Sequence, residues 1–225
     1  KLTYATTSNA TMVDSDGLIK WGPHNLVPYS EDLTGNAVAY SSLTIDSADT
    51  FTFTTDTSYI RFMQHTGVAT KGKYTARVYI SGDTPGDTFN IDLVDDNDGS
   101  DSNTTNVTVS VTPQWVEVTA DFSGSSTFSG VLALYLNRIA SNRSITAGSA
   151  VTIKHIHVYR SDLGGMVEVP GAATGFESYV ATSGAAKYLP RVGHHVYNGS
   201  AWVNEGLLIE SEARTNLVLS SNPTI

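Results

Sequence analysis

The chain has 225 residues, of which 40% are hydrophobic and only 16% charged, so it can bury one core of ordinary domain size with something smaller beside it. Its formal net charge of −9 repels a phosphate backbone, which argues against nucleic acid as a partner. With no cysteine, disulfides and thiolate metal sites are excluded. No apolar run of membrane-spanning length and no charged-then-apolar leader occurs, so we expect no membrane insertion.

Alternation of apolar and polar residues recurs from Thr50 to Arg160, and it predicts a series of short strands. Helical spacing with caps is not found. The residues expected to point inward are Phe51, Phe53, Tyr74, Ala76, Val78, Ile80, Phe89, Ile91, Leu93, Val107, Val109, Val111, Val116, Val118, Ala120, Phe122, Leu132, Leu134 and Leu136. Seven or more such strands predict an all-β fold, a two-sheet antiparallel β-sandwich.

Two local features are expected within this series. The turn 82–86 (GDTPG) separates two alternating strands, which predicts that they form a hairpin. In the strand 150–160 the apolar phase shifts by one residue, from Val151 and Ile153 to Ile156 and Val158. That shift predicts a β-bulge near Lys154 and His155.

Outside this block the composition changes. Residues 163–187 are rich in glycine and alanine with weak periodicity, which is typical of a linker. The stretch 195–210 predicts another hairpin around the turn 198–200 (NGS). Residues 216–221 (NLVLSS) are similar to 25–30 (NLVPYS), so a further module is expected to begin near the last residue. Because the chain starts at Lys1 rather than methionine, we expect a fragment or a processed product of a longer protein.

The C-terminal part resembles a junction common in bacteriophage tail-fibre and spike proteins. The motif runs from Pro190-Arg191 through 206–210 (GLLIE) to 213–217 (ARTNL), and 10–20 (ATMVDSDGLIK) resembles its partner stretch. Four segments between them, 25–33, 74–81, 114–119 and 151–159, are similar to jelly-roll carbohydrate-binding modules of such fibres. The resemblance implies a jelly roll at 25–162, inserted between residues 1–24 and a segment 188–225 that together form a small β-rich platform, with the linker 163–187 before the second half.

What the resemblance implies about function is a non-catalytic virion module of a tail fibre or spike, which supports binding to host-surface glycan during adsorption. The alternative is a structural spacer or trimerisation domain that contacts other virion subunits, with the chain as a homotrimer. A further alternative is an accessory domain of a secreted bacterial adhesin or of a polysaccharide-degrading enzyme. Catalytic signatures such as Gly-x-Ser-x-Gly or His-Glu-x-x-His are missing from the sequence, so we expect no enzyme.

A glycan site needs aromatic faces for sugar C–H surfaces and planar polar groups for hydroxyls. The outward phase of the strands supplies six candidates, and we expect them to share one sheet face: Arg77, Tyr79, Asn90, Asp92, Tyr135 and Asn137. The alternative is a purely structural role, in which these side chains are solvated or packed against a neighbouring subunit. Trp115 is out of phase with Val116 and Val118, and in similar modules such a tryptophan closes the end of the sandwich.

Metal sites have two candidates. The acidic run 92–103 concentrates oxygen ligands suited to Ca²⁺, with Asp95, Asp96, Asp98 and Asp101 as the residues that would hold it, although a solvated acidic loop explains the run as well. His155 and His157 lie two apart on a strand and would share a face, whereas the adjacent His194 and His195 would point to opposite faces. The histidine pair lacks an identifiable third ligand. No other cofactor is expected.

Overall fold

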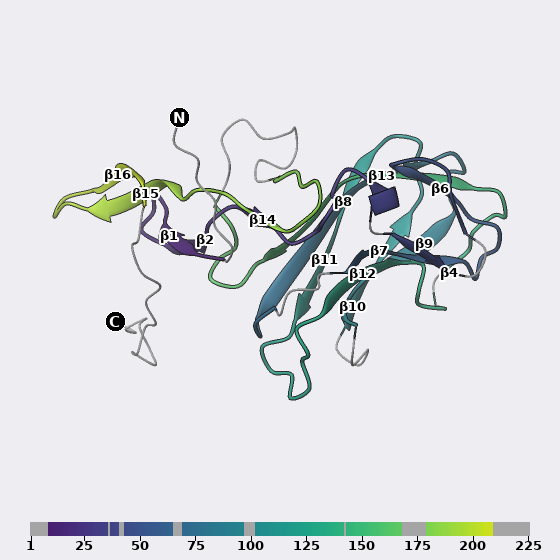
Figure 1. The fold of residues 1–225 in the computed structure, drawn as a ribbon, viewed down its shortest axis with the longest axis horizontal. Coiled ribbons are helices and arrows are strands. Elements are labelled where there is room, and N and C mark those ends of the chain that lie inside the picture. Colours follow the sequence, from purple (N-terminus) through teal and green to yellow (C-terminus); the bar gives the residue numbers. More distant parts are fainter. Residues whose placement is uncertain are drawn as a thin grey trace.

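A computed structural model describes residues 9–35, 37–40, 43–64, 69–96, 102–141, 143–167 and 179–208. These residues form strands, turns and one short 3₁₀ helix, η1 (Leu33–Gly35), and they include no α-helix. Figure 1 shows a two-sheet body at one end of the molecule and two small hairpins at the other. Among the described residues, no helix is long and apolar enough to cross a membrane.

Two five-stranded antiparallel sheets make up the body. The β9 sheet has the strand order β10 (Ser102–Thr108), β9 (Thr88–Asp95), β12 (Leu132–Leu136), β7 (Tyr59–Gln64) and β4 (Val38–Tyr40). The β8 sheet has the order β11 (Gln114–Asp121), β8 (Lys73–Gly82), β13 (Ala150–Arg160), β6 (Thr50–Thr52) and β5 (Thr44–Ile45). The all-β sandwich expected from alternation is confirmed.

The core lies between the two sheets and consists of the inward residues that alternation identifies. Phe51, Phe53 and Phe89 are fully buried, and their rings contact one another. Val111 is an exception, since β10 ends at Thr108 and the side chain of Val111 is 63% exposed in the following turn. Alternation fails there because the strand that would orient the residue has already ended.

The expected hairpin between β8 and β9 is wrong. β8 pairs with β11 and β13, whereas β9 pairs with β10 and β12 in the other sheet. The turn between them carries the chain across the end of the sandwich, and its Gly82 and Gly86 donate backbone hydrogen bonds to residues 110 and 109. A five-residue turn is compatible with both arrangements, and the pairing partners decide between them.

The predicted bulge is confirmed. The pairing of β13 with β8 shifts between Lys154 and His157, and His155 adopts a left-handed backbone with φ of 52°. The extra residue turns the His155 side chain to the outer face of the β8 sheet, where it contacts Tyr79 and Trp115.

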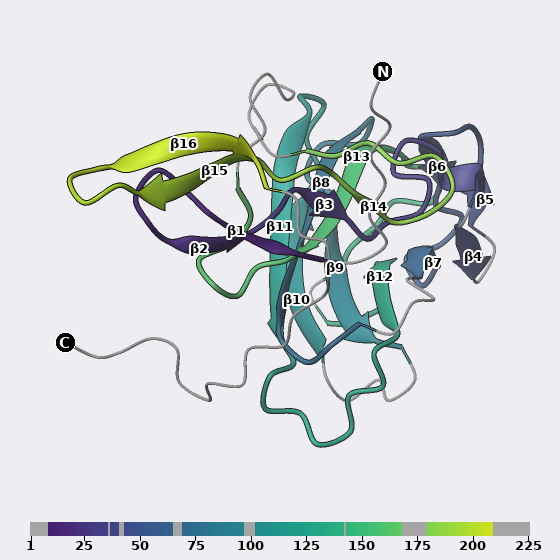
Figure 2. The ribbon, with the colours of Figure 1, turned by 60° about the vertical axis from the view of Figure 1, so that its left-hand side comes forward.

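Two segments far apart in the sequence, 10–21 and 191–207, come together, as Figures 1 and 2 show. β1 (Thr11–Val13) and β2 (Ile19–Trp21) form one hairpin, and β15 (Val192–Tyr197) and β16 (Trp202–Leu207) form the second, which confirms the hairpin expected at 195–210. Val13 N donates to His194 Nδ1 at 3.1 Å, and Arg191 donates to the carbonyl of Thr11 at 3.0 Å. These two hairpins are called the platform below, and they are built from N- and C-terminal segments as expected.

A short pair joins the platform to the sandwich. β3 (His24–Asn25) pairs with β14 (Lys187–Tyr188), and the backbone after β3 continues along the open edge of β13, where Leu26 N donates to the carbonyl of Val158. Val180 and Thr182, within the stretch expected to be a linker, are buried against this junction. Residues 168–178 and 209–225 lie outside the described residues, so the domain boundaries and the start of a further module stay predictions.

Candidate functional site

The outer face of the β9 sheet brings together four of the six glycan candidates. Asp92 on β9 lies opposite Tyr135 on β12. Asn90 lies two residues before Asp92, on the same face of β9, and Asn137 comes directly after β12. Asn90, Asp92 and Asn137 have no exposed surface, and Tyr135 retains 7%. A ligand on this face would therefore meet the side chains that lie over these four residues.

Arg138 is the most prominent of those side chains, and sequence reasoning missed it. Its Nε donates to Asp92 Oδ2 at 2.6 Å, and its guanidinium carbon lies 5.2 Å from the centre of the Tyr135 ring. Its two terminal nitrogens make no hydrogen bond with any described residue, and 27% of the side chain is exposed. The guanidinium is thus anchored at Nε and lies over a ring, and its two terminal nitrogens form a planar pair of donors.

Burial raises the pKa of the Asp92 carboxyl, and Arg138 partly opposes this effect. Thr104 on β10 donates to the second oxygen of Asp92 at 3.3 Å. A fully buried carboxylate persists because it is paired and hydrogen-bonded, so Asp92 acts on a ligand through the position of Arg138.

A second ion pair lies on the other side of Tyr135. Arg61 on β7 donates to Asp96 Oδ2 at 3.1 Å, and the Tyr135 hydroxyl donates to the other oxygen of Asp96. Burial, and then the Asp96 carboxylate, raise the pKa of Tyr135 and keep its hydroxyl protonated. The ring of Tyr59 lies 6.4 Å from that of Tyr135. Tyr59 and Arg61 both point outward on β7, on either side of the buried Ile60. This alternation is visible in the sequence and could have identified both residues.

Asn90 and Asn137 hold the loop that carries Arg138. Asn90 exchanges two hydrogen bonds with the backbone of Ile139, at 2.7 and 3.0 Å. Asn137 has a left-handed backbone with φ of 62°, and its side-chain amide donates to the carbonyls of Asp56 and Ser58. Both asparagines therefore position the loop and do not face a ligand.

The remaining candidates, Arg77 and Tyr79, lie on the outer face of β8, in the opposite sheet. The expectation that all six share one face is therefore wrong, because it depended on the hairpin that β8 and β9 do not form. Trp115 is opposite Tyr79 on β11 and half-buried on the same outer face, so it does not close the end of the sandwich.

Part of that outer face is already occupied by the chain itself. Tyr179 packs on both bulge histidines, with ring centres 5.1 Å from His155 and 5.7 Å from His157. Met166 packs against Tyr159, and Trp115 contacts the same cluster. These contacts lie on the β8 sheet, and none of them involves the β9 sheet.

The residues proposed for metal binding are engaged with protein donors where the structure describes them. Both carboxylate oxygens of Asp95 accept hydrogen bonds from Ser129, and Asp96 is paired with Arg61 and Tyr135. Asp98 and Asp101 lie outside the described residues, and within the described ranges no three metal-binding side chains gather. His157 and His155 do share a face, but His157 Nε2 donates to the carbonyl of His24. Calcium binding by the acidic loop stays a prediction.

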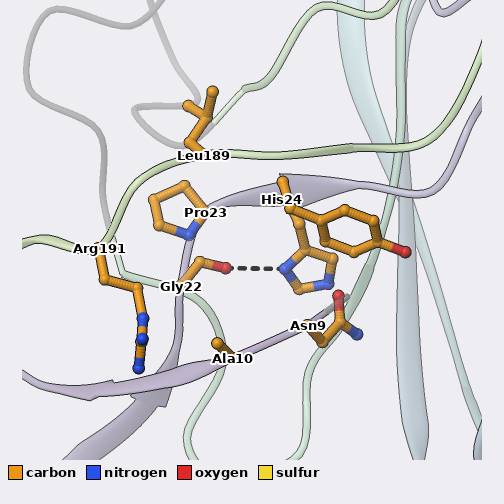
Figure 3. A pocket seen from close by; sticks show the side chains of 8 residues that line it. Asn9, Ala10, Gly22, Pro23, His24, Leu189 and Arg191 are labelled. Carbon is orange, nitrogen blue, oxygen red and sulfur yellow. Dashed lines mark hydrogen bonds between the residues drawn. The ribbon is translucent and has the colours of Figure 1, made fainter. Parts of the chain in front are cut away.

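A small hollow lies where the platform meets the sandwich (Figure 3), and its lining comprises Asn9, Ala10, Gly22, Pro23, His24, Tyr188, Leu189 and Arg191. Its free volume is about 10 Å³, which is room for one water molecule. His24 Nδ1 donates to the carbonyl of Gly22 at 2.8 Å, and its Nε2 accepts from the backbone of Arg160 at 2.9 Å. Both ring nitrogens are therefore occupied, and the hollow is a packing junction.

No family model and no curated protein sequence matches the chain. Among solved structures, it is similar to the carbohydrate-binding module TmCBM61 in complex with β-1,4-galactotriose, with 11% identity, 60% of this chain and 98% of that chain covered, and a TM-score of 0.42. It is also similar to the CBM22-1 xylan-binding domain from Paenibacillus barcinonensis, with 18% identity, 69% and 97% coverage and a TM-score of 0.39. Tailspike protein 4 of bacteriophage CBA120 has 14% identity and a TM-score of 0.39, and the match covers 60% of this chain and 21% of the tailspike. At these values no ligand and no site residue is carried over to this chain.

Proposed function

We propose that this chain is a non-catalytic domain of a bacteriophage tail fibre or spike that binds host-surface glycan through the outer face of the β9 sheet. The observation that carries the glycan part is Arg138, which is anchored by the buried Asp92, lies over the Tyr135 ring and has 27% of its side chain exposed. Such a preorganised planar donor matches a pair of sugar hydroxyls. The virion part is supported by the tail-fibre junction motif of residues 190–217.

An array of bacterial surface polysaccharides tests the glycan part. We expect the wild-type chain to bind at least one glycan, and Arg138→Ala to weaken that binding by at least about tenfold, or about 1.4 kcal/mol. Arg138→Lys retains the charge beside Asp92 without the planar fork, so it should melt like the wild type and still bind less tightly. Lys73→Ala removes an exposed cation from the other sheet and should bind normally. Wild-type affinity in both Arg138 variants would contradict the assignment.

A second candidate function, as a trimerisation unit that contacts other virion subunits, is supported by the platform surface. Of the eleven large apolar side chains that are exposed in the described part of the chain, eight lie on the two platform hairpins: Leu18, Ile19, Val192, Val196, Tyr197, Trp202, Val203 and Leu207. A two-stranded hairpin is marginal in water, so burial against copies of the same chain would stabilise it.

Light scattering tests this second function. We expect the wild-type chain to have three times its monomer mass of 24.0 kDa. Val196 and Val203 are paired across the hairpin, so Val196→Asp with Val203→Asp should produce monomers, because carboxylates would be buried without partners. Val111→Asp changes a 63% exposed valine of the sandwich and should leave the mass unchanged. A monomeric wild-type chain would contradict trimerisation.

A further inference from the structure

Three half-buried rings lie together on the outer face of the β8 sheet, on the side opposite to the proposed glycan site. They come from Tyr79 on β8, Trp115 on β11 and His155 at the bulge of β13, and are called the ring triad below. The ring centre of Tyr79 lies 5.1 Å from that of Trp115 and 5.8 Å from that of His155, and Trp115 and His155 are 6.1 Å apart. The interplanar angles are 31° to 46°, and the Tyr179 ring packs on the His155 side of the triad at 5.1 Å.

The backbone is distorted where it contributes the third ring. An ordinary strand would direct residues 154 and 155 to opposite faces, but the bulge turns His155 outward beside Tyr79. Its left-handed φ of 52° is unfavourable for a residue other than glycine. His155 Nδ1 lies 2.9 Å from Glu31 Oε1, and this contact holds the ring in place. Bulges of this kind often aim a side chain at a ligand.

Paired charges flank the ring triad. Arg77 pairs with Glu117, Lys154 pairs with Asp49 at 3.1 Å, and His155 contacts Glu31. Because each of the two cations is paired with a carboxylate, this rim favours a neutral ligand over an anionic one. It also disfavours a protein partner, because the centre of a protein interface is depleted of charge, and these ion pairs lie directly beside the rings.

We propose that the ring triad is a second saccharide-binding surface, which takes the C–H face of neutral pyranose rings, with the Arg77–Glu117 ion pair at its rim. Tilted aromatic rings with planar polar groups beside them are what such a ligand needs. Because the two sheets face in opposite directions, a chain with both sites would bind two glycan strands at once and gain avidity.

The test measures binding of the full-length chain to an array of bacterial surface polysaccharides and neutral plant oligosaccharides. We expect Tyr79→Ala to lose at least about tenfold in affinity for one or more glycans that Arg138→Ala still binds normally. Tyr79→Phe retains the ring and should stay close to wild-type affinity. Val111→Ala, which shortens a 63% exposed valine in the turn between β10 and β11, should change nothing. Unchanged melting temperatures will show that the variants are folded.

The outcomes separate the two sites. If every glycan bound by the wild-type chain is bound equally well by Tyr79→Ala, the ring triad is not a binding surface. The site at Arg138 is tested separately, by Arg138→Ala and Arg138→Lys. If Tyr79→Ala loses binding to some glycans and Arg138→Ala binds every glycan on the array as tightly as the wild type, the ring triad is supported and the β9 sheet site is contradicted. An array that retains no glycan overturns both.

Discussion

Lowering the pH from 7 to 5 should destabilise the folded chain by about 4 kcal/mol, because two histidines are buried in neutral form. His157 has no exposed surface, and burial lowers its pKa to about 3 even though its Nε2 donates to the carbonyl of His24. His24 is 1% exposed, and burial lowers its pKa to about 4. Both side chains join the platform to the sandwich, so their protonation would open that junction.

The direction of the effect follows from proton uptake. In the unfolded chain both histidines have a pKa near 6.5, so the unfolded state gains protons below this pH while the folded state does not. Each histidine therefore contributes a loss of about 2 kcal/mol by pH 5, and the loss stops growing once the pH falls below the folded pKa. The carboxyls of Asp14 and Asp87 have a lowered pKa, so their stabilising effect is lost only below about pH 4. The histidine window is thus separate from acid unfolding through carboxyls.

Urea unfolding at pH 7, 6 and 5 measures this effect. His157→Gln keeps a donor near the position of Nε2 without a titrating ring, so its free energy of unfolding should fall about half as steeply with pH as that of the wild type. A wild-type free energy that is constant between pH 7 and 5 would show that the junction tolerates a charged imidazole.

Replacement of Asn25 by alanine should lower the free energy of unfolding by about 3 kcal/mol, which corresponds to a drop in melting temperature of roughly 6 to 12 °C for a chain of this size. Asn25 is fully buried. Its amide donates to the carbonyls of Ile156 and Val180 at 3.0 and 2.8 Å, and its Oδ1 accepts from the backbone of Val27 and Val158 at 3.0 and 3.1 Å. One side chain thus ties three separate segments together, and its loss leaves buried backbone groups without partners.

Thermal unfolding of Asn25→Ala beside Asn106→Ala tests this prediction. Asn106 is an exposed asparagine on β10, and its replacement should change the free energy of unfolding by less than about 0.5 kcal/mol. Equal melting temperatures for the two variants would mean that water replaces the lost hydrogen bonds at the junction.

Alternation predicted the buried residues of the sandwich well, because inward or outward direction is a local property of a strand with a two-residue period. The bulge at His155 was predicted from the same period, since a phase shift in apolar residues requires an extra residue. The hairpin β15–β16 followed from its turn residues. Val111 was assigned inward wrongly, because the sequence does not mark where β10 ends.

The site could be predicted only in part. Asp92 and Tyr135 were correctly placed on one face, but Arg77 and Tyr79 were assigned to that face through a hairpin that does not exist. Arg138 was missed because it follows the end of β12, where strand periodicity says nothing about direction. Its position depends on hydrogen bonds from Asn90 to the loop around residue 139.

By itself, then, the sequence determined the class of fold, the core-facing side of most strands, and the bulge and hairpin whose signals lie within a few neighbouring residues. Only the tertiary structure decided that β8 and β9 belong to different sheets, that Asn25 ties distant segments together, and that Arg138 lies over Asp92 and Tyr135. The physical reason is the distance along the sequence between the residues that interact. The direction of a side chain depends on its own strand, whereas strand partners and ion pairs depend on contacts between residues tens of positions apart, which many similar threonine-rich strands would satisfy equally well.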